Sequence, residues 1–243
     1  MRILLLSSHL HYLQATLPLS WTLRRYWPSH PPVHVLCYEP PSFSPPPDFT
    51  YHVMGTPDQY PITRWSDGVS AFLRLMQQVD TDGDPDLGLL MLDDMWLTAP
   101  VNANALQVAW NYCVQFRYVA RFDLTGDRLH SGFASHYGYV GDYRLIISSP
   151  DSGYHLSTMP AIWRLSHLQS VLVPGETPWD LEIFGTPRLA RLRDKCIVLG
   201  YDCWPLRNTL AFRGGDTGKL LLGELDEKDV ADMRREGLLE GLE

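Results

Sequence analysis

Two adjacent acidic residues, Asp93 and Asp94, directly follow the apolar stretch GLLML at residues 88–92. Like charges side by side repel each other, so a compensating partner is expected where such a pair is withdrawn from water. A divalent metal ion is one such partner, and it needs only one or two protein carboxylates when phosphates and water complete its coordination. Aspartate is also common where a strand ends in a turn, because its side chain bonds nearby backbone. The pattern by itself leaves both interpretations open.

A second acidic group lies in PGETPWDLE, residues 174–182. Thr177 followed by Pro178 is typical of a helix start, with threonine as the cap and proline in the first position. Asp180 and Glu182 then fall near the helix N-terminus, where the helix dipole stabilises negative charge. The same two carboxylates are also candidates for a general base, which must lie within hydrogen-bond reach of an acceptor hydroxyl.

Small polar and aromatic residues stand where they could bind a nucleotide. Ser7 and Ser8 end the apolar stretch RILLL, as expected of a buried parallel strand that delivers its end to a site. In RWSDG, residues 64–68, Trp65 could pack on a planar ring, and Ser66 could bind a phosphate or ribose at a helix N-terminus. The alternative for Ser66 is a simple N-cap.

Two further residues are candidates from later segments. FRGGDTGK, residues 212–219, lacks the spacing of a phosphate-binding P-loop, but Lys219 could still reach a diphosphate as a cation. His155 in SGYHLSTMPAIW is a candidate for facing the cleft. The nine histidines form no HxxxH-type pair with an intervening glutamate, so they predict no zinc site.

The elements that must position these residues alternate between strand and helix. Apolar stretches predict strands at 2–8, 33–39, 50–55, 87–94 and 117–124, with amphipathic helices at 13–27, 65–79 and 102–116 between them. Residues 127–150 are rich in Gly, Tyr and Ser and predict irregular or antiparallel structure. Helices are expected at 159–172 and from 178, and strands at 196–202 and 209–215. The prediction is a single α/β domain with an open sheet whose ligand lies at the carboxyl ends of the strands.

Composition narrows the class of protein. The chain has 243 residues, a net charge of −8 and 45% hydrophobic residues, which fits one globular domain over residues 1–225 and a charged helix or tail over 226–243. The acidic balance argues against a nonspecific binder of nucleic acid or anionic membrane, although a local basic cleft stays possible. Four scattered cysteines, a short N-terminal apolar run and no long apolar segment lead us to expect free thiols and a cytoplasmic location.

Three segments together resemble a known family. LLMLDDMWLTAPVN, YHLSTMPAIWRLSHLQSVLVPGETPWDLE and NTLAFRGGDTGK follow one another in the order found in small GT-A-type glycosyltransferase-like proteins of bacteria and phages. The resemblance covers roughly residues 60–220, and its most specific part runs from PAIW through PGE to PWDLE. It implies a GT-A-like fold, an open mixed sheet flanked by helices, and a transferase of the hexosyltransferase class that uses a nucleotide sugar, with a UDP-sugar as the expected donor.

The resemblance also assigns roles to residues. Asp94 would hold Mn²⁺ or Mg²⁺, Asp93 would bind or orient the ribose, and Asp180, or failing it Glu182, would deprotonate the acceptor in an inverting displacement. The motif here is not a full D-x-D and no histidine follows His167, so the metal requirement stays open. Trp65 and Ser66 would line the nucleotide pocket. The residues on the acceptor side would be Trp163, Arg164 and Trp179, together with His155.

Two acceptors and two other functions are compatible with these features. The acceptor is either a hydroxymethylated pyrimidine in phage-type DNA or a saccharide, for example in a cell-surface glycan. DNA would need a basic groove, for which the available arginines are Arg117, Arg121, Arg128, Arg144, Arg164 and Arg188. The other functions are a non-catalytic module that binds a nucleotide sugar, and a nucleotidyltransferase, which LLLSSHLHYL disfavours because it has no glycine.

Overall fold

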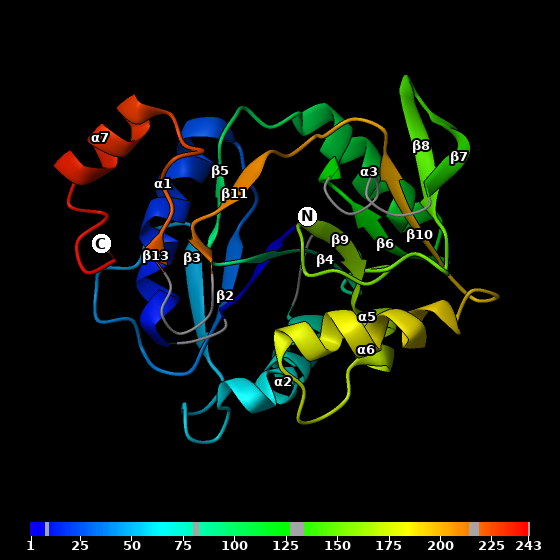
Figure 1. The fold of residues 1–243 in the computed structure, drawn as a ribbon, viewed down its shortest axis with the longest axis horizontal. Helices are drawn as coiled ribbons and strands as arrows, with labels where there is room; N and C mark the ends of the chain where they lie inside the picture. Colours follow the sequence, from blue (N-terminus) through cyan, green and yellow to red (C-terminus); the bar gives the residue numbers. More distant parts are fainter. Residues whose placement is uncertain (8–9, 80–82, 127–133, 214–218, 243) are drawn as a thin grey trace.

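A nine-stranded mixed sheet forms the centre of the molecule, with helices on both faces (Figure 1). The computed structural model describes residues 1–7, 10–79, 83–126, 134–213 and 219–242. The strand order is β3-β2-β1-β4-β9-β6-β10-β8-β7. The strands of this sheet are β1 (Ile3–Leu6), β2 (Val33–Cys37), β3 (Phe49–Val53), β4 (Leu87–Leu92), β6 (Val119–Asp123), β7 (Ala134–Val140), β8 (Tyr143–Ser148), β9 (Ala161–Arg164) and β10 (Ile197–Tyr201).

The first four strands are parallel, as the strand–helix alternation predicted. β1 pairs with β2 on one side and with β4 on the other, and its four residues are all buried. Helix α1 (Thr16–Tyr26) connects β1 to β2, and α2 (Trp65–Gln78) connects β3 to β4. Fully apolar strands of this kind are typical of a parallel sheet that is covered on both faces.

One predicted helix is wrong in its first part. Residues 161–164 form β9, which pairs antiparallel with both β4 and β6, and only Leu165–Val171 continue as helix α5. AIWR is fully buried in the middle of the sheet, where backbone pairing on both sides satisfies its polar groups. The apolar residues continue without a break from this strand into the helix. The spacing of apolar residues alone cannot distinguish a short buried strand from a buried helix.

The second half of the sheet is mixed. β6 and β10 are parallel to each other, and β8 and β7 follow as an antiparallel hairpin at the edge. This confirms antiparallel structure within the described part of residues 127–150. Because β9 is antiparallel to both neighbours, β1, β4, β6 and β10 all run in one direction. We call the edge where they end, at Leu6, Leu92, Asp123 and Tyr201, the carboxyl edge, and the opposite one the amino edge.

Two apolar layers cover the faces of the sheet. One contains α1, α3 (Ala103–Gln115) and α7 (Glu227–Arg235), and the other contains α2, α5 and α6 (Pro178–Ala190). The latter three lie together along one side in Figure 1. Strand β11 (Asn208–Leu210) pairs with β5 (Met95–Leu97), and β12 (Phe212–Arg213) pairs with β13 (Lys219–Leu220), outside the main sheet.

The C-terminal helix is not a peripheral solvated tail. Val230, Met233 and Leu239 are buried in the layer that contains α1, and Asp229 is buried against the hydroxyl of Tyr26. The high charge of residues 226–243 hid this amphipathic face, so this segment packs with the rest of the domain. Within the described ranges, no helix is long and apolar enough to cross a membrane. All four cysteines are free, as expected.

Candidate functional site

The ends of the two central parallel strands bring Ser7 and Asp93 together. Leu6 is paired with Leu92 at the last position of the β1–β4 ladder, so the next residue of each strand emerges at the same point of the carboxyl edge. The Ser7 hydroxyl is hydrogen-bonded to the Asp93 carboxylate. Ser8, predicted to act beside Ser7, lies outside the described residues.

Asp93 and Asp94 occupy a tight turn between β4 and β5. The Asp93 carbonyl accepts a hydrogen bond from the indole of Trp96, and the Asp94 carbonyl accepts one from the Ala211 amide at 2.7 Å. The turn backbone is therefore held by neighbouring backbone and core groups. The carboxylates also accept hydrogen bonds from backbone amides of the turn itself. Asp93 Oδ2 and Asp94 Oδ1, however, are buried and have no hydrogen-bond partner among the described residues.

Burial and mutual repulsion shift the titration of this pair. Burial, followed by the charge of Asp94, raises the pKa of Asp93 well above its usual range. Burial also raises the pKa of Asp94 to about 6. The bonds from the turn amides do not offset this burial, because one oxygen of each carboxyl group stays without a hydrogen-bond partner among the described residues. A bound cation would compensate the two carboxylates. The pair therefore resembles a binding site that lowers the stability of the protein until its ligand binds.

The donor set fits a divalent metal that shares its coordination with a ligand. The part of the chain that the structure describes contains no group of three or more His, Cys, Asp or Glu residues able to hold a metal by themselves. Two carboxylates with uncompensated oxygens are what a hard cation such as Mg²⁺ or Mn²⁺ takes from a protein when phosphate oxygens and water supply the rest. Asp93 and Asp94 therefore fit the metal that the resemblance implies.

Ser66 serves the fold and does not cap α2. The helix begins at Trp65, with Arg64 in the cap position, so the predicted N-cap is displaced. The Ser66 hydroxyl donates to the carbonyl of Val173 at 2.7 Å and accepts from the Glu176 amide at 3.0 Å. These bonds occupy the hydroxyl and fasten the start of α2 to the loop before α6. The start of α2 lies on the carboxyl side of the sheet, because α2 connects β3 to the parallel strand β4. The start of α6 therefore lies on the same side.

Trp65 and Trp163 are interior residues in this structure. Both are buried and line a cavity of about 20 Å³ together with Leu6, Leu90 and Thr158. Such a cavity has room for a single water and excludes a nucleotide base. The Trp65 indole nitrogen is buried without a hydrogen-bond partner among described residues. The predicted stacking of Trp65 on a base, and the predicted acceptor contact of Trp163, would both require this layer to open.

The two candidate bases differ in their surroundings. Asp180 completes a capping box with Thr177, since its Oδ2 accepts from the Thr177 amide at 3.0 Å and hydroxyl at 2.7 Å. These bonds lower the pKa of Asp180. Glu182 is buried and accepts from the Thr158 amide at 2.7 Å and hydroxyl at 2.9 Å, so it holds the loop before β9. The predicted helix start is confirmed, and Asp180 is the more accessible carboxylate.

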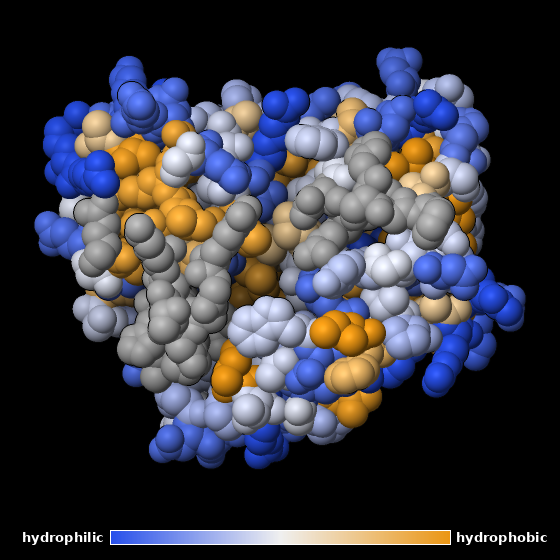
Figure 2. All heavy atoms as spheres, in the orientation of Figure 1, coloured by the Kyte–Doolittle hydropathy of each residue, from blue (hydrophilic) through white to orange (hydrophobic). Residues whose placement is uncertain are grey.

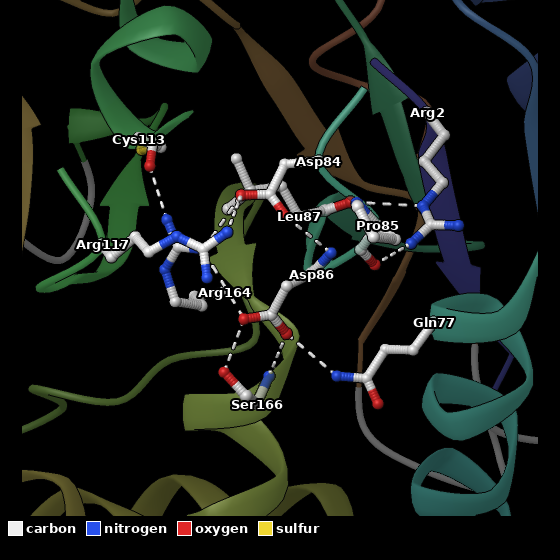
Figure 3. A network of polar contacts seen from close by, with 10 residues as sticks. All are labelled: Arg2, Gln77, Asp84, Pro85, Asp86, Leu87, Cys113, Arg117, Arg164 and Ser166. Atoms are coloured by element: carbon white, nitrogen blue, oxygen red, sulfur yellow. Dashed lines mark hydrogen bonds and ion pairs between the residues drawn. The ribbon is translucent and has the colours of Figure 1, made fainter. Parts of the chain in front are cut away.

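Arg164 belongs to a different part of the molecule. It pairs with Leu87, the first residue of β4, and therefore lies at the amino edge. Its guanidinium is buried between Asp84 and Asp86, at 3.3 and 3.5 Å, and also donates to the carbonyl of Cys113 (Figure 3). An acceptor at Asp94 could not reach it. The predicted acceptor role of Arg164 is replaced by a structural one.

His155 is also an interior residue. It is buried, and its Nδ1 lies 3.0 Å from the Ser148 hydroxyl. Burial, followed by the charge of Arg121, lowers the pKa of His155 to about 4. Trp179, by contrast, is exposed on α6 beside Ile183 and Phe184, and Figure 2 shows apolar side chains at the surface over this helix. Of the four predicted acceptor residues, Trp179 alone is open to a ligand.

Sequence reasoning did not single out an ion pair at the end of β6. Arg121 and Asp123 are both about 1% exposed, with Nη2 and Oδ2 2.9 Å apart, and Arg121 lies over the ring of Trp163. The available signal was the sequence RFDL, in which an acid ends an apolar strand as Asp93 does. Lys219 belongs to β13, but its side chain lies outside the described set.

No family model matches the chain, and no curated protein does. The geometry of the carboxyl edge is therefore the basis on which its function is inferred.

Proposed function

We propose that this protein is a glycosyltransferase of GT-A-like fold that moves a hexosyl group from a nucleotide sugar, with a UDP-sugar as the expected donor, to an acceptor hydroxyl. The observation that carries the proposal is the buried Asp93–Asp94 turn at the end of the central parallel strand. The open mixed sheet with helices on both faces is in keeping with that fold. The ligand is expected outside the carboxyl ends of the strands, where this turn lies.

Asp94 holds Mn²⁺ or Mg²⁺, and Asp93, fixed by the Ser7 hydroxyl, orients the donor ribose or shares the metal. The metal, when bound, neutralises the charge that develops on the departing diphosphate. The raised pKa values of both carboxyls imply that metal binding displaces protons and strengthens as the pH rises through about 6.

The transfer is an inverting displacement at the anomeric carbon. The acceptor oxygen forms a bond to the anomeric carbon while the bond between that carbon and the diphosphate oxygen breaks. The nucleoside diphosphate leaves with the electron pair of the broken bond. The acceptor proton passes to Asp180. This carboxylate stands at the start of α6, which the Ser66–Glu176 bond holds on the carboxyl side of the sheet. Its lowered pKa keeps it ionised, which is the form that a general base requires, and makes it a weak base, so its contribution is to position and accept the proton as the new bond forms.

The test is release of nucleoside diphosphate from UDP-glucose, UDP-galactose and UDP-N-acetylglucosamine, with and without Mn²⁺. Turnover in wild type that Asp94→Asn abolishes supports the proposal. Binding of a donor without turnover, unchanged by Asp180→Asn, would favour the non-catalytic module. Absence of both binding and turnover across donors and both metals would contradict it.

A further inference from the structure

A nucleic-acid acceptor requires several cations that together face its phosphates, and the five candidate arginines that the structure describes are not gathered at the carboxyl edge. Arg128 lies outside the described residues. Arg121 and Arg164 are buried in ion pairs, so neither can contact a phosphate. Proteins that bind nucleic acid contact several phosphates at once, and each of these contacts needs a Lys or Arg side chain at the protein surface.

The other three candidates are paired or lie elsewhere. Arg188 makes a two-bond contact with Glu176, at 2.8 and 2.6 Å. Arg144 lies near the carboxyl edge and its side chain is 49% exposed, but it is a single cation with the Asp202 carboxylate 3.6 Å away. Arg117 is exposed, but its partner is Asp84, which also holds Arg164 at the amino edge. The basic groove required by a DNA acceptor is therefore not formed by these five residues.

The exposed cations near α6 lie at the wrong edge. Arg191, Arg193 and Lys195 follow the end of α6 and directly precede β10. Since β10 begins with Ile197 opposite Val119, this cluster lies at the amino edge, away from Asp93 and Asp94. It also contains Asp194, which reduces its charge.

A different feature lies at the carboxyl edge. The segment from Asp202 to Ala211 leaves β10 and crosses to β5, as Figure 1 shows. The Leu206 amide bonds the Leu124 carbonyl at 3.3 Å near the end of β6, and the Ala211 amide bonds Asp94. This single segment thus connects the β6 end to the acidic turn.

Trp204 lies on this segment and is 53% exposed. The guanidinium of Arg207 lies 5.6 Å from its ring centroid, and the ring rests against Gly126, where a Cβ would lie 1.5 Å from the indole nitrogen. The ring is therefore held in place without being covered. At about 3.5 Å per residue, Trp204 is at most about 25 Å along the chain from Ala211, and so within reach of an acceptor of a few units.

We propose that the acceptor is a saccharide of low charge that packs the C–H face of a sugar ring on Trp204, and not a nucleic acid. An exposed indole offers a large, rigid apolar surface with a polar edge, which suits a ring that is apolar on its faces and polar around its rim. A nucleic-acid base could also stack on Trp204, but its phosphates would meet the Asp202 carboxylate, which lies 3.6 Å from Arg144, and the Arg207 guanidinium is already engaged over the Trp204 ring. The inference rests on the proposed transferase function and names its acceptor class.

The experiment measures donor and acceptor separately. Binding of tetra- to hexasaccharides of glucose, N-acetylglucosamine and mannose is followed by tryptophan fluorescence and calorimetry, without donor. Binding of duplex DNA, with and without 5-hydroxymethylcytosine, is followed by gel shift at low and moderate salt. UDP-sugar binding with Mn²⁺ is followed by thermal shift as an independent readout of the proposed function.

We expect at least one oligosaccharide to bind, at least tenfold weaker binding by Trp204→Ala, and recovery in Trp204→Phe. Trp204 is exposed, so all variants should fold and keep the donor-induced thermal shift.

Loss of saccharide binding in Trp179→Ala, with binding unchanged in Trp204→Ala, would overturn the assignment of Trp204. Binding of hydroxymethylated DNA, or no saccharide binding at all, would overturn the acceptor class while an intact donor shift left the transferase function standing. No donor shift with saccharide binding retained would contradict the transferase function alone.

Discussion

Asp93 and Asp94 stand side by side in a buried turn, and each keeps one carboxylate oxygen that no described group bonds. Their backbone carbonyls accept hydrogen bonds from the Trp96 indole and the Ala211 amide. The structure thus buries two acidic groups whose ionisation destabilises the ligand-free protein, an arrangement typical of binding sites whose ligand supplies the compensation.

Asp94→Asn should make the ligand-free protein more stable at pH 7.5. The folded-state pKa of about 6 lies above the ordinary value of 3.8, so the folded chain binds a proton that the unfolded chain has lost between these pH values. The contribution of Asp94 to stability therefore falls as the pH rises from about 4 to about 6 and stays low above that. The gain in the variant should be roughly 1–3 kcal/mol at pH 7.5 and vanish near pH 4.

The measurement is chemical denaturation of wild type and Asp94→Asn from pH 4 to 8, without metal. A variant that is less stable at every pH would indicate that the carboxylate only shapes the turn.

A pair of histidines should give the protein the opposite pH dependence. His34 Nδ1 lies 3.0 Å from His52 Nε2 between β2 and β3. Burial, followed by the charges of His52 and Arg2, lowers the pKa of His34 to about 4. Its ordinary value is 6.5, so the unfolded chain binds a proton first, and stability falls as the pH drops from about 6.5 to about 4.

The loss should be about 1–2 kcal/mol, because part of the shift is screened by solvent. In His34→Gln the denaturation midpoint should change less with pH over this range than it does in wild type. An unchanged pH profile in the variant would show that the loss comes from other groups.

Asp180→Asn and Thr177→Ala separate the base from the helix cap. Both changes disturb the same capping box, so both variants should be less stable than wild type, with a cost of about 1 kcal/mol for Thr177→Ala. Only Asp180→Asn removes the proposed base, so it alone should lower kcat, by a factor of about 10² or more, with donor binding retained. Equal loss of turnover in both variants would assign the effect to the cap.

Arg164→Met should unfold or strongly destabilise the protein through the amino-edge network in Figure 3. It leaves the half-buried Asp84 and Asp86 without their shared cation and the Cys113 carbonyl without its donor, which should cost roughly 2–4 kcal/mol. Arg117→Ala is the matched control, since Arg117 contacts the same Asp84 at 3.8 Å from an exposed position and should cost less than 1 kcal/mol. Thermal denaturation of both variants measures the two losses of stability. Equal losses would contradict the structural role of Arg164 in this network.

Local sequence predicted much of the fold. β1, β2 and β4 were recognisable as short apolar runs between amphipathic helices, and Thr177 and Pro178 marked the start of α6 by their chemistry. β9 escaped because AIWR is a strand only through pairing with β4 and β6, which are distant in sequence. Period and propensity carry no information on such long-range pairing.

The position of the candidate site residues was predictable where they follow a strand end. Asp93, Asp94 and Ser7 follow the ends of buried parallel strands, and the topology brings them to one edge. The acceptor residues were not predictable in the same way. Arg164 and His155 are buried by partners far along the chain or in a loop. Trp204 gains its position from a segment that crosses the sheet edge.

The central claim is that Asp93 and Asp94 bind a nucleotide sugar through a divalent metal. Calorimetric titration of a UDP-sugar into wild type, Asp94→Asn and Thr177→Ala, with and without Mn²⁺ at pH 7.5, tests it most directly. We predict metal-dependent binding in wild type and Thr177→Ala, and at least a tenfold loss in Asp94→Asn although that variant is the more stable protein. Equal affinity in Asp94→Asn, or binding that does not depend on the metal, would contradict the claim.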